Sequence, residues 1–152
     1  ESITLEKEIN TLKMYLEIEA VRLEHKFDYE IIIDKNIELE FIKIPPLIIQ
    51  PFAENAIWHG LNNKPNKGLL KIEIQEINEN CISISIIDDG IGRKAAALLK
   101  KEQLKHKSYG IDITINRLQL VNSKNNYRII DLSDDNDKIT GTKVELQIYY
   151  DD

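Results

Sequence analysis

Apolar and polar residues follow two different rhythms along this chain, and the changes of rhythm mark the expected elements. Over residues 4–25 the apolar positions recur every three or four residues, which predicts an amphipathic helix. Its apolar stripe consists of Leu5, Ile9, Leu12, Leu16, Ala20 and Leu23. Met14 and Ile18 widen the band. Such a helix either packs on its own domain or ends a longer coiled coil whose partner is another helix.

Later segments alternate apolar and polar residues with a period of two, which predicts strands with one apolar face. These strands are expected over residues 27–34, 70–75, 82–86, 127–132 and 142–149. The second and third are joined by a polar turn at residues 78–80 and should form a hairpin. A short strand or extended lead-in is expected over residues 36–44, where Pro45 and Pro46 stop it.

Two further helices are expected between the strands. One covers residues 47–60, with Pro46 in its first turn, Gly60 at its end, and Leu47, Phe52 and Ala56 on or near its buried side. The other begins at Gly110 and covers residues 111–122. Strands with one apolar face and amphipathic helices predict a two-layer α/β sandwich, in which a mixed, mostly antiparallel sheet carries helices on one face.

Composition narrows the class of protein. The chain has 152 residues, 42% of them hydrophobic and 30% charged, which suits one globular domain with a normal core. A net charge of −6 argues against a nucleic-acid-binding protein, which would normally present a basic face. The single cysteine, Cys81, excludes an internal disulfide and a cysteine-based zinc cluster. No apolar run approaches the roughly 20 residues that span a bilayer.

Four short motifs occur in an order that is typical of a known family of domains. Ile-Pro-Pro-Leu-Ile-Ile-Gln-Pro-Phe-Ala-Glu-Asn-Ala-Ile-Trp-His-Gly fills residues 44–60, Asp-Asp-Gly-Ile-Gly fills residues 88–92, Gly110 precedes a helix, and Gly141-Thr142 precedes the last strand. This order resembles the ATP-binding domain shared by sensor histidine kinases and gyrase-type ATPases, a Bergerat-type fold. The amino-acid sequence of the first motif is similar to the Asn box of LytS-like sensor histidine kinases.

The resemblance implies a division of the chain. Residues 1–25 would be the end of the dimerising histidine-phosphotransfer hairpin, and residues 26–152 would be the catalytic and ATP-binding domain. The implied activity is transfer of the ATP γ-phosphate to a histidine of the same protein and from there to a response regulator. The implied location is the cytoplasmic side of a bacterial inner membrane, with membrane segments and the hairpin upstream of residue 1.

The resemblance also implies roles for particular residues. The amide oxygen of Asn55 would be a ligand of Mg²⁺, a hard ion that takes few protein oxygens beside phosphate and water. Asp88 would accept a hydrogen bond from the adenine amine, and Thr142 would support the same edge. Gly90 and Gly92 would let the backbone approach the base. Taken alone, the Asp-Asp-Gly-Ile-Gly motif favours an ordinary turn.

Further residues are assigned to the nucleotide on weaker grounds. Gly110 and Ile111 would open a helix whose free N–H groups suit phosphate, although Asp112 replaces a glycine of the family pattern. His59 lies one helical turn after Asn55 and would approach the nucleotide. Glu54, the other catalytic candidate beside Asn55, would polarise a water molecule or order the Mg²⁺ shell, and it is equally read as a solvated helix residue. Basic side chains around the site are possible phosphate partners or are simply solvated: Lys64, Lys67, Arg93 and Lys94.

The segment over residues 90–108 is basic within an acidic chain. It holds few large apolar residues apart from a possible short helix at residues 95–99. Such a segment is either a solvated loop or, as the resemblance implies, a mobile lid over ATP.

The phosphoacceptor histidine is not recognisable in this chain. The family places it in a Pro-His-Phe context, whereas His25, His59 and His106 stand in Glu-His-Lys, Trp-His-Gly and Lys-His-Lys. The expected phosphoacceptor therefore lies outside these residues. Two alternatives stay open: another ATPase or serine kinase of the superfamily, and a non-catalytic interaction module that kept the fold and lost the nucleotide.

Overall fold

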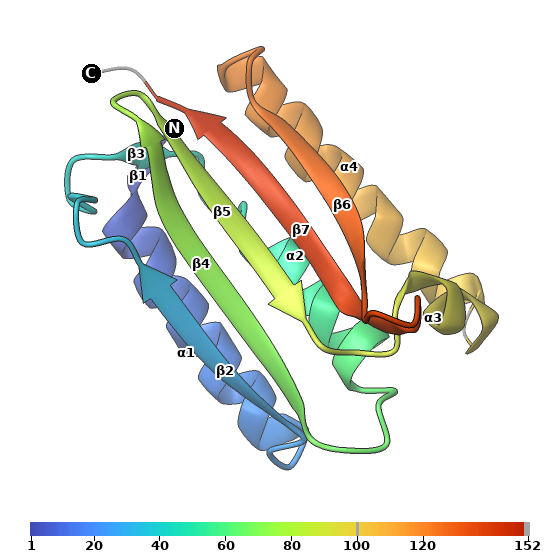
Figure 1. The fold of residues 1–152 in the computed structure, drawn as a ribbon. Helices are drawn as coiled ribbons and strands as arrows, with labels where there is room; N and C mark the ends of the chain where they lie inside the picture. Colours follow the sequence, from blue (N-terminus) through green and yellow to red (C-terminus); the bar gives the residue numbers. More distant parts are fainter. Residues whose placement is uncertain (100, 151–152) are drawn as a thin grey trace.

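A five-stranded sheet forms one layer of the molecule (Figure 1). The computed structural model describes residues 1–99 and 101–150, with residues 101–109 described by their backbone alone. The sheet order is β2-β4-β5-β7-β6, made of β2 (Phe27–Ile33), β4 (Gly68–Asn78), β5 (Cys81–Asp88), β6 (Asn126–Ser133) and β7 (Ile139–Tyr149). β2 and β4 are parallel and the other neighbours are antiparallel, so the predicted mixed, mostly antiparallel sheet is confirmed.

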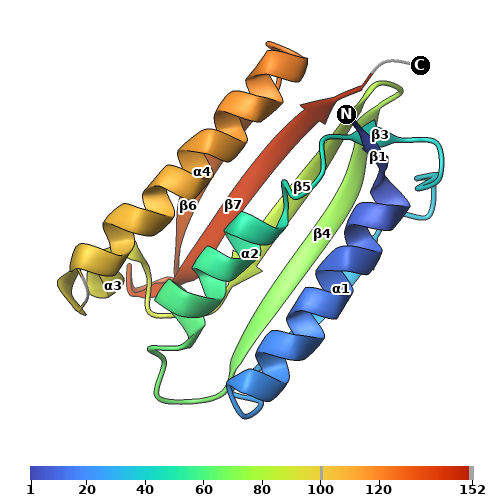
Figure 2. The same ribbon diagram turned by 180° about the vertical axis from the view of Figure 1, so that it is seen from behind.

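The helices cover one face of this sheet, as Figure 2 shows from behind. They are α1 (Leu5–Arg22), α2 (Gln50–Asn55), a π-helix η1 (Ala56–Leu61), α3 (Arg93–Leu99) and α4 (Lys101–Val121). A two-stranded ribbon of β1 (Ile3–Thr4) and β3 (Lys43–Ile44) joins the start of α1 to the segment before α2. The predicted two-layer sandwich with helices on one face is confirmed. Among the described helices, none has the length and apolar character needed to span a membrane.

Helix α1 is an integral part of the hydrophobic core. Thr4 caps it, since its hydroxyl accepts a hydrogen bond from the backbone N–H of Lys7 at 3.2 Å. Five residues of the predicted stripe are buried in the same core as the strands: Leu5, Ile9, Leu12, Leu16 and Ala20. This stripe therefore packs on its own domain, which was the first of the two alternatives. Met14 and Ile18 do not widen the buried band, because they are 67% and 65% exposed.

The segment before α2 differs from the prediction. The helix begins at Gln50 rather than at Pro46, and Pro51 occupies its first turn. Leu47 has a positive φ of 56°, which a right-handed helix does not allow, and its side chain is 49% exposed rather than buried. The strand expected over residues 36–44 is limited to Lys43–Ile44.

Gly110 does not open a helix, contrary to the prediction. Helix α4 begins at Lys101 and continues through Gly110 to Val121. Residues 101–109 contain no proline and several strong helix formers, and a glycine inside a helix costs only about 1 kcal/mol relative to alanine. The short helix predicted at residues 95–99 is present as part of α3. Lys100 and the side chains of residues 101–109, which include most cations of the expected lid, lie outside the described residues.

Candidate functional site

A pocket of about 60 Å³ lies between the helix layer and the ends of β5 and β7. α2 and η1 supply Asn55 and His59, and the strands supply Asp88 and Thr142. Three more of the predicted site residues also line it: Gly92, Arg93 and Ile111. Its remaining walls are mainly apolar: Phe52, Ala56, Ile86, Ala96, Ile129 and Val144. Residues from five separate parts of the chain therefore meet around one apolar cavity with a few polar groups, which is the usual composition of a small-molecule site.

Asp88 is the buried charge of this pocket. Its side chain is only 4% exposed, and its residue pairs with Thr142 across the β5–β7 ladder. Burial raises the pKa of the Asp88 carboxyl to about 7, although a hydrogen bond from the backbone N–H of Gly90, at 2.9 Å, partly opposes the rise. The carboxyl can therefore change its protonation near neutral pH, while it stays positioned as an acceptor.

Close backbone packing holds the Asp88 carboxyl in place. A Cβ atom on Gly60 would lie 2.6 Å from Asp88 Oδ1, and a Cβ on Gly90 would lie 2.3 Å from the carbonyl carbon of Gly60. The backbone N–H of Ile91 also donates to the Gly60 carbonyl at 3.2 Å. The glycine of the first motif therefore packs directly on the Asp-Asp-Gly motif, and Gly90 packs against Gly60 instead of lining the pocket.

The π-helix η1 follows Asn55 directly. Its wider turn is closed by a hydrogen bond from the backbone N–H of Asn62 to the carbonyl of Ile57, at 2.7 Å. Single π turns within helices are frequent at functional sites. Here the turn carries His59 on the pocket side and Gly60 against Asp88.

Glu54 does not line the pocket with Asn55. It lies near Tyr15 of α1, whose pKa is raised first by burial and then by the charges of Glu19 and Glu54. Arg22, three residues after Glu19, bonds that carboxylate at 3.2 Å and covers the Trp58 ring at 5.3 Å. Glu54 therefore belongs to the polar seam between α1 and α2.

Three of the four predicted cations of the site already have carboxylate partners. Arg93 donates two hydrogen bonds of 2.8 Å to Asp131 of β6, and this contact lowers the pKa of Asp131. Two further predicted phosphate partners are also in ion pairs, Lys64 with Asp89 at 3.1 Å and Lys67 with Asp28 at 3.0 Å. Lys94 is exposed.

Gly110 lies inside α4 and outside the pocket lining, whereas Ile111 lines the pocket. Asp112, the departure from the family pattern, is exposed and does not line the pocket. Its charge therefore does not face the cavity that Asn55 and Asp88 share.

Two side chains hold the segment before α2, and of these Glu8 was not singled out from the sequence. The Glu8 carboxylate, 2% exposed, accepts hydrogen bonds from the backbone N–H groups of Leu47 and Ile48, both at 2.9 Å. Arg117 of α4 donates to the Pro46 carbonyl at 2.8 Å. A glutamate three residues after Leu5, on the apolar side of α1, was the available signal for a buried acceptor.

The donor set suits a metal that is held mainly by phosphate. Among the side chains that the structure describes, in residues 1–99 and 110–150, no three His, Cys, Asp or Glu residues are grouped so as to hold a metal ion. Asn55 brings an amide oxygen to the pocket. Mg²⁺ commonly takes one or two protein oxygens and completes its shell with phosphate and water, so this sparse set fits Mg²⁺.

No protein-family model matches the chain. It is 37% identical over 114 residues to the sensor protein LytS of Oceanobacillus iheyensis, covering 72% of this chain and 19% of that protein. It is 36% identical over 92 residues to the sensor histidine kinase YpdA of Escherichia coli, covering 60% of this chain and 16% of that protein. The chain thus spans about a fifth or less of the length of these relatives.

Solved structures share the fold. The mycobacterial sensor histidine kinase MprB superposes with a TM-score of 0.66 and 13% identity, covering 98% of this chain and 96% of that one. The nucleotide-free catalytic domain of histidine kinase ThkA gives a TM-score of 0.65 and 13% identity, covering 98% and 94%. ThkA in complex with the response regulator TrrA gives a TM-score of 0.57 at 13% identity, covering 99% and 42%. By sequence this chain is a LytS-like domain of the sensor histidine kinases, and it has the fold of their catalytic domain.

Proposed function

We propose that this domain binds Mg-ATP in the pocket between η1 and β5 and serves as the phosphate-donating half of a sensor histidine kinase. The observation that carries the proposal is the buried Asp88 carboxylate facing the same cavity as Asn55 and Thr142. These residues come from motifs whose order resembles that of the family, and the sequence relatives bear the names of sensor kinases.

The adenine end of the nucleotide would lie against Asp88. A carboxylate there accepts a hydrogen bond from the exocyclic amine of adenine, whereas guanine presents a carbonyl at the same position. The apolar walls from Ile86 and Val144 would contact the faces of the base. Because Asp88 is nine-tenths buried, an unsatisfied or repelled carboxylate costs far more than at the surface, and this supports selection of adenine over guanine.

The phosphate end would lie toward Asn55. This residue would hold Mg²⁺ through its amide oxygen, and the ion, when bound, neutralises charge on the phosphate oxygens. His59 follows on the same side of the helix and would approach the nucleotide. Because such transfer depends mainly on positioning and charge neutralisation, the contribution of these residues is to orient the γ-phosphate rather than to react with it.

A nucleotide requires more room than the pocket offers. Its volume of about 60 Å³ is well below the roughly 300–1,000 Å³ typical of ligand sites. The element that can move to enlarge the pocket is α3, which lines it through Arg93 and Ala96. The Arg93–Asp131 ion pair connects α3 to β6. We infer that α3 moves outward on binding, which agrees with a lid in this part of the chain.

The phosphate would pass to a histidine outside residues 1–152 and then to a response regulator. None of the three histidines of this chain stands in the family's phosphoacceptor context. Residues 1–25, whose helix α1 packs its apolar stripe in the core of this domain, would link the domain to the hairpin that carries the acceptor, with membrane attachment through other parts of the protein. The ThkA–TrrA complex supports a response regulator as the partner class.

Calorimetric titration of Mg-ATP and Mg-GTP into the chain tests the proposal. We expect saturable binding of ATP, at least about tenfold weaker binding of GTP, and loss of ATP binding in Asn55→Ala and Asp88→Asn. Asp89→Asn is the matched control, since its carboxylate bonds the Leu69 backbone and Lys64 outside the pocket. Absence of ATP binding by a folded wild-type chain would favour the non-catalytic interaction module.

A phosphotransfer assay distinguishes a histidine kinase from the remaining alternative, a serine kinase of the same superfamily. A histidine hairpin of a LytS-like kinase, supplied as a second protein with labelled ATP, should become phosphorylated at histidine by this chain. Acid-labile label on the hairpin is the expected result, because phosphohistidine hydrolyses in acid. Acid-stable label on a serine would instead identify a serine kinase of the superfamily.

A further inference from the structure

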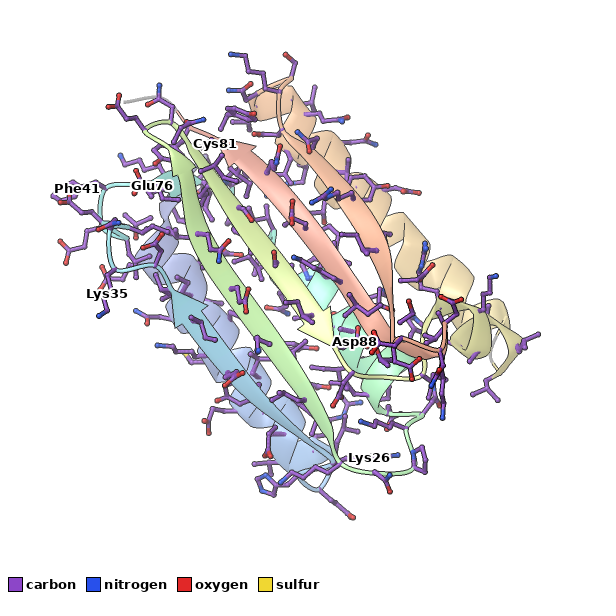
Figure 3. The ribbon with its side chains drawn as sticks, viewed as in Figure 1. Lys26, Lys35, Phe41, Glu76, Cys81 and Asp88 are labelled. Atoms are coloured by element: carbon purple, nitrogen blue, oxygen red, sulfur yellow. The ribbon has the colours of Figure 1, made fainter. Side chains whose placement is uncertain are left out.

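A groove with an acidic rim lies at the end of the sheet opposite the nucleotide pocket. Figure 3 shows Phe41 and Glu76 at this end and Asp88 at the other. We define the acidic groove by Ile37, Phe41 and Tyr150, which supply apolar surface, and by Glu38, Glu76 and Glu79. Its volume is about 540 Å³, far larger than that of the nucleotide pocket.

An exposed aromatic residue stands at the centre of this region. Phe41 is 76% exposed, although its neighbour Ile42 is buried in the core. The connection that carries it is held by the first turn of α1, since the backbone N–H groups of Leu5 and Glu6 donate to the carbonyls of Ile42 and Leu39 at 2.8 and 3.2 Å. Phe41 is therefore presented to solvent by an anchored backbone.

The charged residues that line the hollows beside Phe41 are all acidic. A second hollow of about 360 Å³ shares Ile37, Glu38 and Phe41 with the groove and adds Glu6 and Glu40 to its walls. No lysine, arginine or histidine lines either hollow. Lys35, on the same connection, lines a separate hollow with Asp34 and Gln75.

These glutamates are not neutralised within the domain. Among the residues that the structure describes, none of the five lies within 4.0 Å of a basic side-chain nitrogen. The five carboxylates repel one another, and the exposed Phe41 side chain leaves apolar surface in contact with water. A partner that brings both positive charge and an apolar side chain relieves both conditions at once.

We propose that the acidic groove docks a segment of another polypeptide in which a large apolar side chain stands between lysine or arginine residues. The apolar side chain packs on Phe41 and Ile37, and the flanking cations pair with Glu38 and Glu76. Two hollows that share Ile37, Glu38 and Phe41 suit an extended segment that crosses Phe41. The groove shares none of its lining residues with the nucleotide pocket, so docking does not depend on the proposed kinase activity.

Fluorescence anisotropy with two labelled ten-residue peptides tests the proposal. One peptide alternates lysine and leucine, and the other alternates lysine and serine with the same charge. We expect saturable binding of the lysine–leucine peptide below 1 mM, at least roughly tenfold weaker binding of the lysine–serine peptide, and weaker binding at higher salt. Absence of saturable binding, or equal binding of both peptides, overturns the proposal.

Variants locate the binding surface. Phe41→Ser and the double change Glu38→Lys with Glu76→Lys should each weaken peptide binding by roughly tenfold. Leu120→Ser, at a residue that is 87% exposed on α4, is the apolar control, and Asp112→Lys with Asp135→Lys is the charge control. Equal losses in the control variants would show attraction to the acidic chain as a whole and overturn the proposal. Thermal unfolding establishes that each variant is folded, and ATP titration should be unchanged in both groove variants.

Discussion

The carboxylate of Glu8 caps the start of the segment that carries Asn55, with 2.9 Å between Glu8 Oε1 and the backbone nitrogen of Ile48. The same carboxylate also accepts from Leu47 at 2.9 Å and from Ile49 at 3.3 Å. These N–H groups precede the first helical residue and would otherwise be buried without partners. One side chain of α1 therefore sets where α2 begins.

Glu8→Ala should lower the free energy of unfolding by about 3 kcal/mol, because it leaves buried N–H groups without an acceptor. Glu8→Gln should cost less, since its amide oxygen still accepts. Urea denaturation measures both. Glu6→Ala is the matched control: it lies in the same first turn and shares the helix-dipole contribution, but its side chain is exposed. Equal losses in Glu6→Ala and Glu8→Ala would contradict the capping role.

Asp88→Asn should stabilise the domain more at pH 8 than at pH 5. Because the folded pKa is about 7 and the usual value is 3.8, the folded state holds the proton more strongly. The stability from this group is fully present below pH 4 and is lost as the pH rises toward 7. The linkage relation then gives a difference of about 2–3 kcal/mol between the two pH values.

Urea denaturation of Asp88→Asn and of the wild-type chain at pH 5 and pH 8 measures this difference. Other titrating groups contribute equally to both chains and cancel. The same change should abolish ATP binding, so we expect Asp88→Asn to be more stable than the wild-type chain at pH 8 and yet unable to bind ATP. A constant stability gap between the two chains at both pH values would contradict a raised pKa of Asp88.

Gly60→Ala and Gly110→Ala should have opposite effects on stability. A Cβ on Gly60 meets Asp88 Oδ1 at 2.6 Å, whereas a Cβ on Gly110 meets nothing within 4 Å. Gly60→Ala should therefore cost about 2 kcal/mol and displace the carboxyl that we assign to adenine. Gly110→Ala should add about 0.5–1 kcal/mol, because α4 is continuous there.

Thermal unfolding measures the stability of the two glycine variants, and ATP titration measures whether Gly60→Ala also weakens nucleotide binding. Loss of stability in Gly110→Ala would indicate that residue 110 needs a non-helical backbone, as the resemblance had implied.

Asp131→Asn should strengthen Mg-ATP binding by up to about fivefold. The Arg93–Asp131 pair is exposed, so breaking it changes the free energy by at most about 1 kcal/mol. If α3 must move for the nucleotide to enter, weakening this fastening raises the fraction of molecules that can bind. Calorimetric titration measures the change. Weaker binding in Asp131→Asn would mean that the pair supports the binding state instead of opposing it.

The local elements follow from the chain alone because the periods of helices and strands are properties of neighbouring residues. The stripe from Leu5 to Ala20 predicts α1, and the alternation from Ile82 to Ile86 predicts β5. The motif order indicates the family and brings Asn55, Asp88 and Thr142 to one pocket. Local rules fail where two of them compete, as at Gly110, where helix formers on both sides outweigh one glycine.

Contacts between distant residues are decided by the tertiary structure. Glu8 reaches Ile48 across 40 positions, Arg117 reaches Pro46 across 71, and Arg93 reaches Asp131 across 38. No periodicity links such pairs, since each depends on how whole elements pack. The sequence by itself determined most of the elements, the family and seven of the thirteen pocket-lining residues. Packing alone decided where α2 begins, that Gly60 supports Asp88, and that Phe41 stands exposed among glutamates with no ion pair to the described residues.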